Sequence, residues 1–264
     1  MTDRATGTAV VTGASGGMGA VFADRLAARG HDLILVARNR PKLETLAGEL
    51  AEQTGRRVEV LAADLADRAQ SVVVEDRLRS DESIELLVNN AGLSGFSPLT
   101  GADPDAAAEM IAVNTTAFTR LAIAALAGLT RRGRGAIINL SSALALNIYP
   151  VSAVYSGTKS YVIAFTQALQ QELGDGPVRA QLAVPGGVDT AFWDGSGIEL
   201  ESLSADAVMS PEDAVDAVLA GFDAGEPVTI PSMPDITDWT SFDQARKDLI
   251  PKLSRAHPAD RYTP

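Results

Sequence analysis

Tyr155 and Lys159 stand four residues apart, and Ser142 precedes the tyrosine by thirteen residues. In a helix, positions i and i+4 lie on one face about 6 Å apart, so the ammonium would stand beside the phenol. A free phenol titrates at about pH 10, and a fixed positive charge nearby lowers its pKa. The pair therefore indicates general acid/base chemistry on a substrate oxygen. The common alternative for such a pair is a half-exposed helix face without a function.

A glycine cluster near the N-terminus joins a short apolar segment to a helical pattern. Residues 8–19 are typical of a strand, a turn and a helix start, and Gly30 is the expected end of that helix. Glycines at such a junction let the backbone approach a ligand, and the free amides and dipole of the helix start favour a pyrophosphate. The spacing through Gly13, Gly17 and Gly19 is Gly-x3-Gly-x-Gly, unlike that of most dinucleotide sites. A tight turn without a ligand is the alternative.

Ser15 belongs to a second motif in the same turn. Residues 13–17 fit Gly-x-Ser-x-Gly, the nucleophile elbow of α/β-hydrolases. A serine hydrolase also needs an acid and a histidine downstream, and the chain has only His31 and His257. The first begins the next expected strand and the second lies in a proline-containing tail, so hydrolysis by Ser15 is the weaker hypothesis.

The motifs together resemble a short-chain dehydrogenase/reductase of the short, single-domain type. Six family motifs match in order between residues 8 and 190. The matches are Thr12, Gly13, Gly17 and Gly19 in Thr-Gly-x3-Gly-x-Gly; Asn89, Asn90, Ala91 and Gly92 in Asn-Asn-Ala-Gly; Asn114 in the helix after the fourth strand; Ser142; Tyr155 and Lys159 in Tyr-x3-Lys; and Pro185, Gly186, Val188 and Thr190 after the sixth strand.

This resemblance implies hydride transfer from a nicotinamide to a carbonyl carbon, and the reverse oxidation of an alcohol. Ser142 would donate a hydrogen bond to the substrate oxygen and Tyr155 would deliver the proton. Lys159 would hold the nicotinamide ribose, and Asn114 would bind a water that links Lys159 to solvent; an asparagine inside a helix can instead bond only to backbone or water. The implied cofactor-binding residues are Gly13, Ser15, Gly16, Gly17, Met18, Gly19, Arg38, Asp64, Leu65, Asn90, Ala91, Gly92, Tyr155, Lys159, Pro185, Gly186, Val188 and Thr190.

The end of the second expected strand predicts the type of dinucleotide. An acid there bonds the ribose 2′-hydroxyl, whereas an arginine accommodates the 2′-phosphate of NADP. Ala37 takes the acid position, Arg38 follows it and Arg40 is nearby, so NADP(H) is favoured over NAD(H). The resemblance also implies that Asp64 contacts the adenine ring, with a helix N-cap as its alternative. Thr190 is expected at the nicotinamide carboxamide, with a turn cap as its alternative.

Hydrophobic periodicity predicts the fold independently of these motifs. Seven short apolar runs alternate with six helical segments, which indicates a parallel sheet covered on both faces. We expect an α/β, three-layer, doubly wound Rossmann fold with a seven-stranded parallel sheet, and a ligand site at the carboxyl ends of its strands. The expected strands are 8–11, 32–36, 57–61, 84–88, 135–140, 178–183 and 228–230; the expected helices are 17–29, 41–54, 70–79, 105–129, 153–173 and 211–222.

Composition limits the class of protein. The 264 residues are 46% hydrophobic and contain no linker-like stretch, so one domain over 1–264 is expected. A net charge of -12 argues against nucleic acid as a partner. Without cysteine there is no disulfide or thiol nucleophile, and two distant histidines predict no metal site. We find no apolar run of signal or bilayer-spanning length, so a cytoplasmic protein is expected.

Two segments outside the motifs are expected to bind substrate or partners. The resemblance implies that residues 191–210 form a lid over the substrate. Its apolar residues predict a hydrophobic or aromatic carbonyl compound, with ordinary core residues as the alternative. The residues expected to line this pocket are Phe192, Trp193, Ile198 and Leu200 in the lid, and Leu144, Leu146 and Ile148 before Tyr155.

The tail, residues 232–264, extends beyond the shorter family members. Its apolar residues predict one amphipathic helix, ended or kinked at Pro251, that packs on the domain or on a neighbouring subunit. The resemblance implies a homodimer or homotetramer. A non-enzymatic NADP-binding regulator on the same fold is the alternative from another class, and the intact Ser142, Tyr155 and Lys159 argue against it.

Overall fold

The computed structural model describes residues 6–194, 196–199 and 203–262. The chain divides into two compact units, Met1–Pro231 and Ser232–Pro264. The first unit holds all the motif residues, and the second is the tail.

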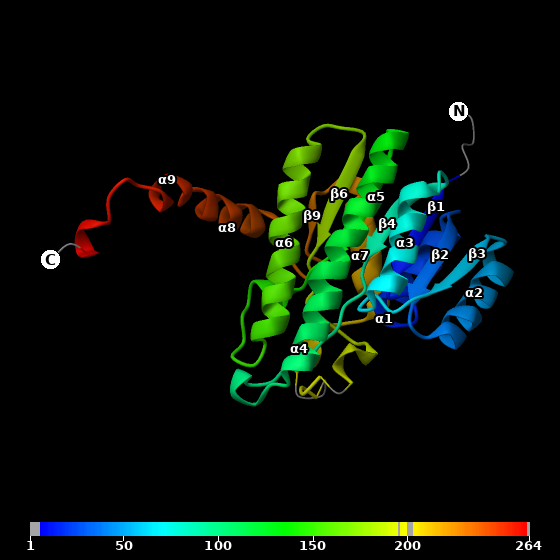
Figure 1. The fold of residues 1–264 in the computed structure, drawn as a ribbon, viewed down its shortest axis with the longest axis horizontal. Coiled ribbons are helices and arrows are strands. Elements are labelled where there is room, and N and C mark those ends of the chain that lie inside the picture. Colours follow the sequence, from blue (N-terminus) through cyan, green and yellow to red (C-terminus); the bar gives the residue numbers. More distant parts are fainter. Residues whose placement is uncertain (1–5, 195, 200–202, 263–264) are drawn as a thin grey trace. The chain divides into compact units, whose positions relative to one another are not determined.

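Seven parallel strands form the sheet of the first unit, in the order β3-β2-β1-β4-β5-β6-β9 (Figure 1). This confirms the doubly wound α/β prediction. Because β1 leads to β2 and β3 on one side while β4 and the later strands lie on the other, the switch point falls between β1 and β4. The strands are β1 (Thr8–Thr12), β2 (Asp32–Ala37), β3 (Val58–Ala62), β4 (Ile84–Asn89), β5 (Gly135–Leu140), β6 (Val178–Ala183) and β9 (Val228–Thr229).

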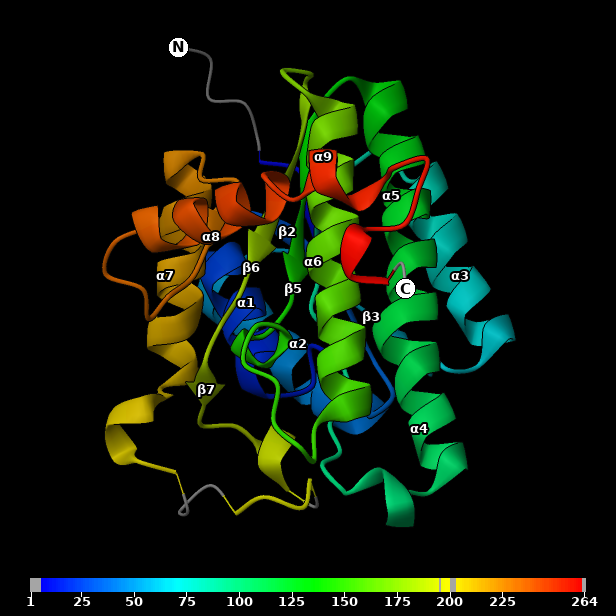
Figure 2. The same cartoon turned by 90° about the vertical axis from the view of Figure 1, so that its left-hand side faces the viewer.

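Helices cover both faces of the sheet (Figures 1 and 2). Side chains alternate along each strand, so Ala9 and Val11 of β1 join one core while Val10 joins the other. The first core includes α1 (Gly17–Ala28), α2 (Arg40–Thr54) and α7 (Pro211–Ala224). The second core includes α3 (Arg68–Ser80), α5 (Phe118–Arg132) and α6 (Ala153–Leu173).

The helix expected over 105–129 consists of three parts. It begins as α4 (Pro104–Ile111), passes through a π-helical turn at Ala112–Ala117, and continues as α5. The π-helical turn contains Asn114, and such turns are frequent at functional sites. The apolar spacing runs through the turn without a break, which is why the sequence pattern does not reveal it.

This continuous run corrects the expectation that no segment is long enough to span a bilayer. By length and composition alone, Pro104–Arg132 qualifies as a span, and half of its apolar window is buried in the protein. The buried part includes Leu121, Ala125 and Leu129, which pack in the second core. A core helix that packs on a sheet passes the same test, so this observation is weak evidence for a membrane.

Two short strands that the sequence did not predict lie beside the lid. β7 (Gly187–Val188) pairs with β8 (Val208–Met209), and the Asp189 N–H donates to the Met209 carbonyl at 2.9 Å. Because each strand has two residues, neither gives a detectable alternation. The pair joins the start of the lid to its end.

The second unit contains two helices where one was expected. α8 spans Thr237–Lys247, and α9 spans Ile250–Leu253 with Pro251 in its first turn. Proline lacks an N–H and is tolerated there, whereas it cannot continue a helix from within. Inside α8, the Trp239 and Phe242 rings lie 5.8 Å apart.

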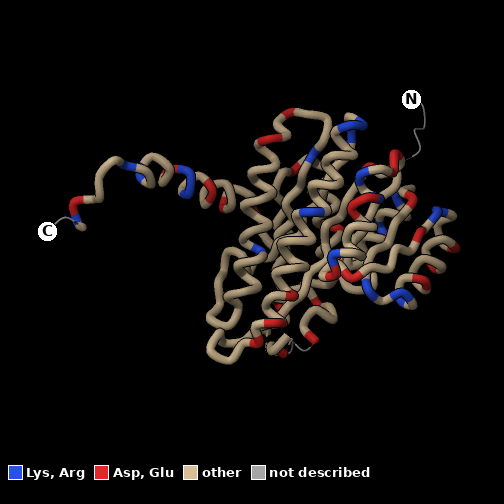
Figure 3. The backbone as a smooth tube through the Cα atoms, in the orientation of Figure 1, with Lys and Arg blue, Asp and Glu red and all other residues tan. Residues whose placement is uncertain are grey.

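Both acidic and basic residues lie on the surface helices α2 and α3, and few lie in the strands (Figure 3). The Glu75 side chain is buried, whereas its partners Arg120 and Arg68 are partly exposed. Glu75 of α3 accepts from the Arg120 guanidinium of α5 at 2.7 and 2.9 Å, and from Arg68 at 3.0 Å. Burial raises the pKa of Glu75, but the hydrogen bonds and charges of Arg120, Arg68 and Ser71 outweigh it, so the pKa lies below its usual value. This pair fixes α5 against α3.

We predict that Arg120→Met lowers the free energy of unfolding by more than the loss of a surface ion pair does, because it removes the bidentate partner of a buried carboxylate. The control is Arg79→Ala, because Arg79 and its partner Asp76 are both exposed. This variant should lower the free energy of unfolding by less than about 0.5 kcal/mol. Urea denaturation at pH 7 measures both. Equal losses would show that the Glu75 pair contributes no more than a surface pair.

Candidate active site

A cleft of about 810 Å³ lies at the carboxyl ends of the strands. It is lined by the turns that follow β1, β4, β5 and β6, as expected for a parallel sheet. The predicted site residues that line it are Gly13, Ser15, Gly16, Gly17, Met18, Gly19, Arg38, Asn90, Ala91, Gly92, Ser142, Tyr155, Lys159, Pro185, Gly186, Val188 and Thr190. Asp64, Leu65 and Asn114 are absent from its lining.

Thr12 holds the turns after β1 and β4 together. Its buried hydroxyl donates to the Val88 carbonyl at 3.2 Å and accepts from the N–H groups of Asn90 and Ala91, both at 3.0 Å. The Asn90 side chain donates in return to the Thr12 carbonyl at 2.8 Å. These bonds fix the glycine turn at the switch point.

The glycine turn fits an anionic ligand. Gly13 and Gly17 have φ angles of 69° and 53°, which favour glycine, and a Cβ on Gly19 would lie 2.2 Å from the Gly13 carbonyl oxygen. No side chain caps the first turn of α1, whose N-cap is Gly16. A pyrophosphate therefore fits here against backbone amides and the positive end of a helix dipole.

Two cations line the cleft beside the end of β2. Arg38 lies 3.3 Å from the Glu109 carboxylate of α4, and both side chains are about half exposed. Lys42, which the sequence argument missed, lines the same cleft, whereas Arg40 does not and instead lies 3.6 Å from Glu44. Lys42 lies in the first turn of α2, directly after the loop that contains Arg38.

Asp64 and Leu65 lie away from the cleft lining. The Asp64 carboxylate accepts from the Ala66 N–H at 2.9 Å, and Leu65 is buried in the second core. The alternative for Asp64, a helix N-cap, is wrong, because Asp67 caps α3.

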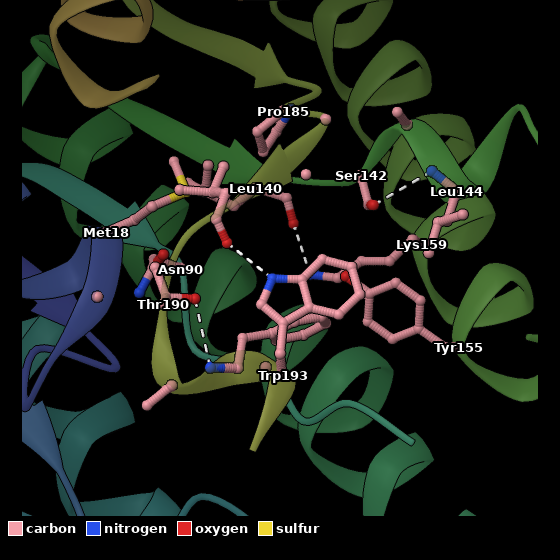
Figure 4. Close-up of a pocket in the computed structure, with 18 of the residues that line it drawn as sticks. Met18, Asn90, Leu140, Ser142, Leu144, Tyr155, Lys159, Pro185, Thr190 and Trp193 are labelled. Atoms are coloured by element: carbon pink, nitrogen blue, oxygen red, sulfur yellow. Dashed lines mark hydrogen bonds between the residues drawn. The ribbon is translucent and has the colours of Figure 1, made fainter. Parts of the chain in front are cut away.

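Tyr155 and Lys159 lie on α6 and point into the cleft with Ser142 (Figure 4). Both side chains are buried, with 4% and 6% of their surfaces exposed. The Lys159 ammonium lies 5.9 Å from the Tyr155 ring centroid and donates to the Leu140 carbonyl at 2.9 Å. Ser142 follows β5 and caps the short 3-10 helix Ala143–Ala145. The helix and the strand end thus place all three side chains at one point.

Burial decides the pKa values of these groups. It raises the pKa of Tyr155 to about 12, and a hydrogen bond from Ser142 offsets only part of this effect. Burial also lowers the pKa of Lys159 to about 8. The pKa of Tyr155 thus lies above its ordinary value and not below it as expected, because loss of hydration disfavours the phenolate. In this geometry Tyr155 keeps its proton at neutral pH and is a proton donor.

Asn114 fastens the loop after β4 to the catalytic helix. Its side-chain oxygen accepts from the Leu93 N–H at 2.8 Å, and its side-chain nitrogen donates to the Leu93 carbonyl at 2.9 Å and to Thr158 of α6 at 3.1 Å. The side chain thus bonds to backbone, which was the alternative to a water-binding role.

Four aromatic rings form the substrate end of the cleft. Tyr155, Phe96, Phe192 and Trp193 have neighbouring centroids 5.4 to 6.3 Å apart. Leu144 and Ile198 pack against them and line the cleft, as expected.

The expectation for two further residues is wrong. Leu146 and Ile148 are exposed and do not line the cleft, because the loop turns their side chains outward, and Tyr149 and Val151 line it instead. Leu200 lies outside the described residues.

Thr190 begins the lid and caps its first turn. Its hydroxyl accepts from the Phe192 N–H at 3.3 Å, which matches the alternative of a turn cap. It also lines the cleft, where a Cβ on Gly17 would lie 3.1 Å from the Thr190 methyl group. The Trp193 indole N–H donates to the Val188 carbonyl at 2.8 Å. The lid therefore starts against the glycine turn.

Ser15 also lines the cleft, but the hydrolase hypothesis lacks a base in this unit. His31 precedes β2, at the amino end of the strands, and its ring bonds to the Gly7 carbonyl at 2.7 Å. Ser15 follows β1 at the carboxyl end, so the two cannot act together.

Comparison of the sequence with models of known protein families identifies the family of this chain. Residues 7–199 match the family model of the short chain dehydrogenases. This chain belongs to that family.

Two solved structures are similar over nearly the whole chain. A short-chain dehydrogenase from Sphingobium yanoikuyae in complex with NADPH is 38% identical, with a TM-score of 0.93 over 97% of this chain and 100% of that one. The bulky-bulky ketone specific alcohol dehydrogenase from Comamonas testosteroni is 36% identical, with a TM-score of 0.90 over 99% of this chain and 100% of that one.

Among curated proteins, human 17-beta-hydroxysteroid dehydrogenase type 3 is 35% identical over 186 residues, which is 70% of this chain and 60% of that protein. A very-long-chain 3-oxoacyl-CoA reductase from Anas platyrhynchos is also 35% identical and is covered to 58%. The chain thus spans about three fifths of the length of these relatives.

We predict that Lys159→Met stabilises the fold at pH 7 by about 1–3 kcal/mol, because it removes a buried ammonium. The folded pKa of about 8 lies below the unfolded value, so the folded state binds fewer protons than the unfolded chain between the two values. The stability of the natural protein therefore rises with pH across this window, and the advantage of the variant shrinks.

Urea denaturation at pH 7 and pH 9.5 measures this difference. A variant that is less stable than the natural protein at pH 7 would show that the bond to Leu140 outweighs the cost of burying the charge.

Proposed function

We propose that this dehydrogenase reduces a bulky hydrophobic ketone with NADPH and that Tyr155 supplies the proton. The observation that carries the proposal is a buried, protonated tyrosine at an aromatic wall, in the same cleft as a glycine turn and two cations. The neighbours support it, since one was solved with NADPH and the other is described as specific for bulky-bulky ketones.

The residues present fit NADPH. Backbone amides after Gly16 would face the pyrophosphate, Arg38 and Lys42 would bind the 2′-phosphate, and Lys159 would bind the nicotinamide ribose. The cofactor supplies the hydride. Glu109 contacts Arg38, so the guanidinium is shared between this carboxylate and the phosphate.

The groups that transfer the proton and stabilise the developing charge lie on α6 and in the turn after β5. As the carbonyl oxygen gains negative charge, Ser142 donates a hydrogen bond to it and Tyr155 delivers its proton. With a pKa of about 12, Tyr155 carries at neutral pH the proton that reduction needs. Lys159 lies beside Tyr155, and its ammonium stabilises the negative charge that develops on the phenol oxygen.

We predict that Tyr155→Phe lowers kcat for ketone reduction by about 10²–10⁴-fold, because no other proton donor replaces the phenol. NADPH binding, followed by fluorescence titration, should change little. Tyr161→Phe is the matched control, since Tyr161 lies on the same helix and its hydroxyl bonds to Thr119. More than about a tenth of the turnover remaining in Tyr155→Phe would reject this tyrosine as the acid.

We predict that Arg38→Ala raises KM for NADPH by about 10-fold or more and changes KM for NADH little, because only NADPH carries the 2′-phosphate. Arg40→Ala is the control, since Arg40 does not line the cleft. Steady-state kinetics with each cofactor give the result, and an equal effect on both cofactors would remove Arg38 from phosphate binding.

Tight NADPH binding without turnover of any ketone or aldehyde would instead favour the regulator hypothesis. The cytoplasmic location, the homodimer or homotetramer and the packing of residues 232–264 stay predictions from the sequence.

A further inference from the structure

The loop after β4 is bonded directly to the lid. The Ser94 hydroxyl donates to the Phe192 carbonyl at 2.7 Å, and the Phe96 N–H donates to the Ser196 carbonyl at 2.7 Å. Residues 93–97 and the start of the lid are about a hundred positions apart in sequence, so these bonds are long-range contacts at the substrate end of the cleft.

A glycine permits this close approach. Gly197 has a φ angle of 91°, and a Cβ there would lie 2.5 Å from the Phe96 carbonyl oxygen. Any other residue would be strained and would push the lid away from the loop. The loop and the lid are therefore joined by the Ser94 hydroxyl and by the backbone bond from Phe96 to Ser196, beside which Gly197 allows the close approach.

The other end of the loop is anchored to the catalytic helix. Asn114 holds both backbone groups of Leu93 and bonds to Thr158 of α6. Hydrogen bonds thus connect α6 through Asn114 to Leu93, and the next residue, Ser94, bonds to the lid. This connection restrains the lid relative to Tyr155.

We propose that Ser94 is a positioning residue that fixes the aromatic wall and so sets which ketones the enzyme prefers. It holds the backbone of Phe192, whose ring lies 5.4 Å from Tyr155 and 5.5 Å from Trp193. When the aromatic rings are already ordered, a bulky substituent binds against them without the entropic cost of ordering them. A small ketone does not reach these rings, so its binding does not depend on their order. This inference rests on the proposed function.

The kinetic test compares a ketone that carries two phenyl groups with acetone, at saturating NADPH. Ser94→Ala should lower kcat/KM for the diaryl ketone by about 3- to 10-fold and leave that for acetone unchanged, because one hydrogen bond is lost. Ser94→Thr, which keeps the hydroxyl, should restore the preference. Ser97→Ala is the control on the same loop, where the exposed residue bonds to Val151 through its backbone N–H. An unchanged ratio of the two kcat/KM values in Ser94→Ala overturns the proposal.

A second readout does not depend on catalysis. The chain has two tryptophans, so Trp239→Phe leaves Trp193 of the lid as the only indole. In that background, Ser94→Ala and Gly197→Ala should both increase acrylamide quenching of Trp193, and Ser97→Ala should not. Unchanged quenching in both variants overturns the lid contact. If the natural protein reduces no ketone, the proposed function fails while quenching still reports on the contact.

Discussion

The hydrogen bonds of Thr12 are the constraint on which the cleft depends. They join β1 to the Asn90–Gly92 turn at the switch point, where the chain leaves the sheet in opposite directions. One buried hydroxyl bonds to a carbonyl and two amides, so three backbone groups depend on it for a hydrogen-bond partner. The glycine turn and the Asn-Asn-Ala-Gly turn are thereby held together.

Tyr155 and Lys159, the proposed catalytic pair, illustrate a conflict between stability and function. Tyr155 and Lys159 are both buried, and burial shifts the pKa of each group toward its neutral form. The fold tolerates this because α6 and β5 are positioned by large apolar cores, and the single bond from Lys159 to Leu140 compensates little of the lost hydration. Functional sites are the places where such a cost is expected. The dry environment that destabilises the lysine also keeps the tyrosine protonated.

Much of this architecture was predictable because strand alternation and the parallel order together determine it. Once β1, β4, β5 and β6 were recognised, their following turns had to meet at one edge, which is why scattered motifs such as Gly13 and Pro185 line one cleft. The π-helical turn at Asn114 was not predictable, since apolar spacing continues through it. The outward orientation of Ile148 was also not predictable, because a loop has no periodicity to indicate direction. Ser94 acts through a backbone carbonyl about a hundred positions away, and no local pattern encodes such a partner.

The direction of the Tyr155 pKa shift could not be predicted from the spacing of Tyr155 and Lys159 in the sequence. A charge at about 6 Å, with an effective dielectric constant of about 20, is worth about 3 kcal/mol, or about two pKa units. Full burial shifts a pKa by up to about 3–5 units in the opposite direction. Spacing along a helix gives the first quantity and contains nothing about the second, which depends on how α6, the lid and Phe96 together exclude water. Because the same burial lowers the pKa of Lys159 to about 8, the lysine charge itself declines above that pH. The chemistry of Tyr155 is therefore decided by packing between distant segments and only then adjusted by its neighbour one turn away.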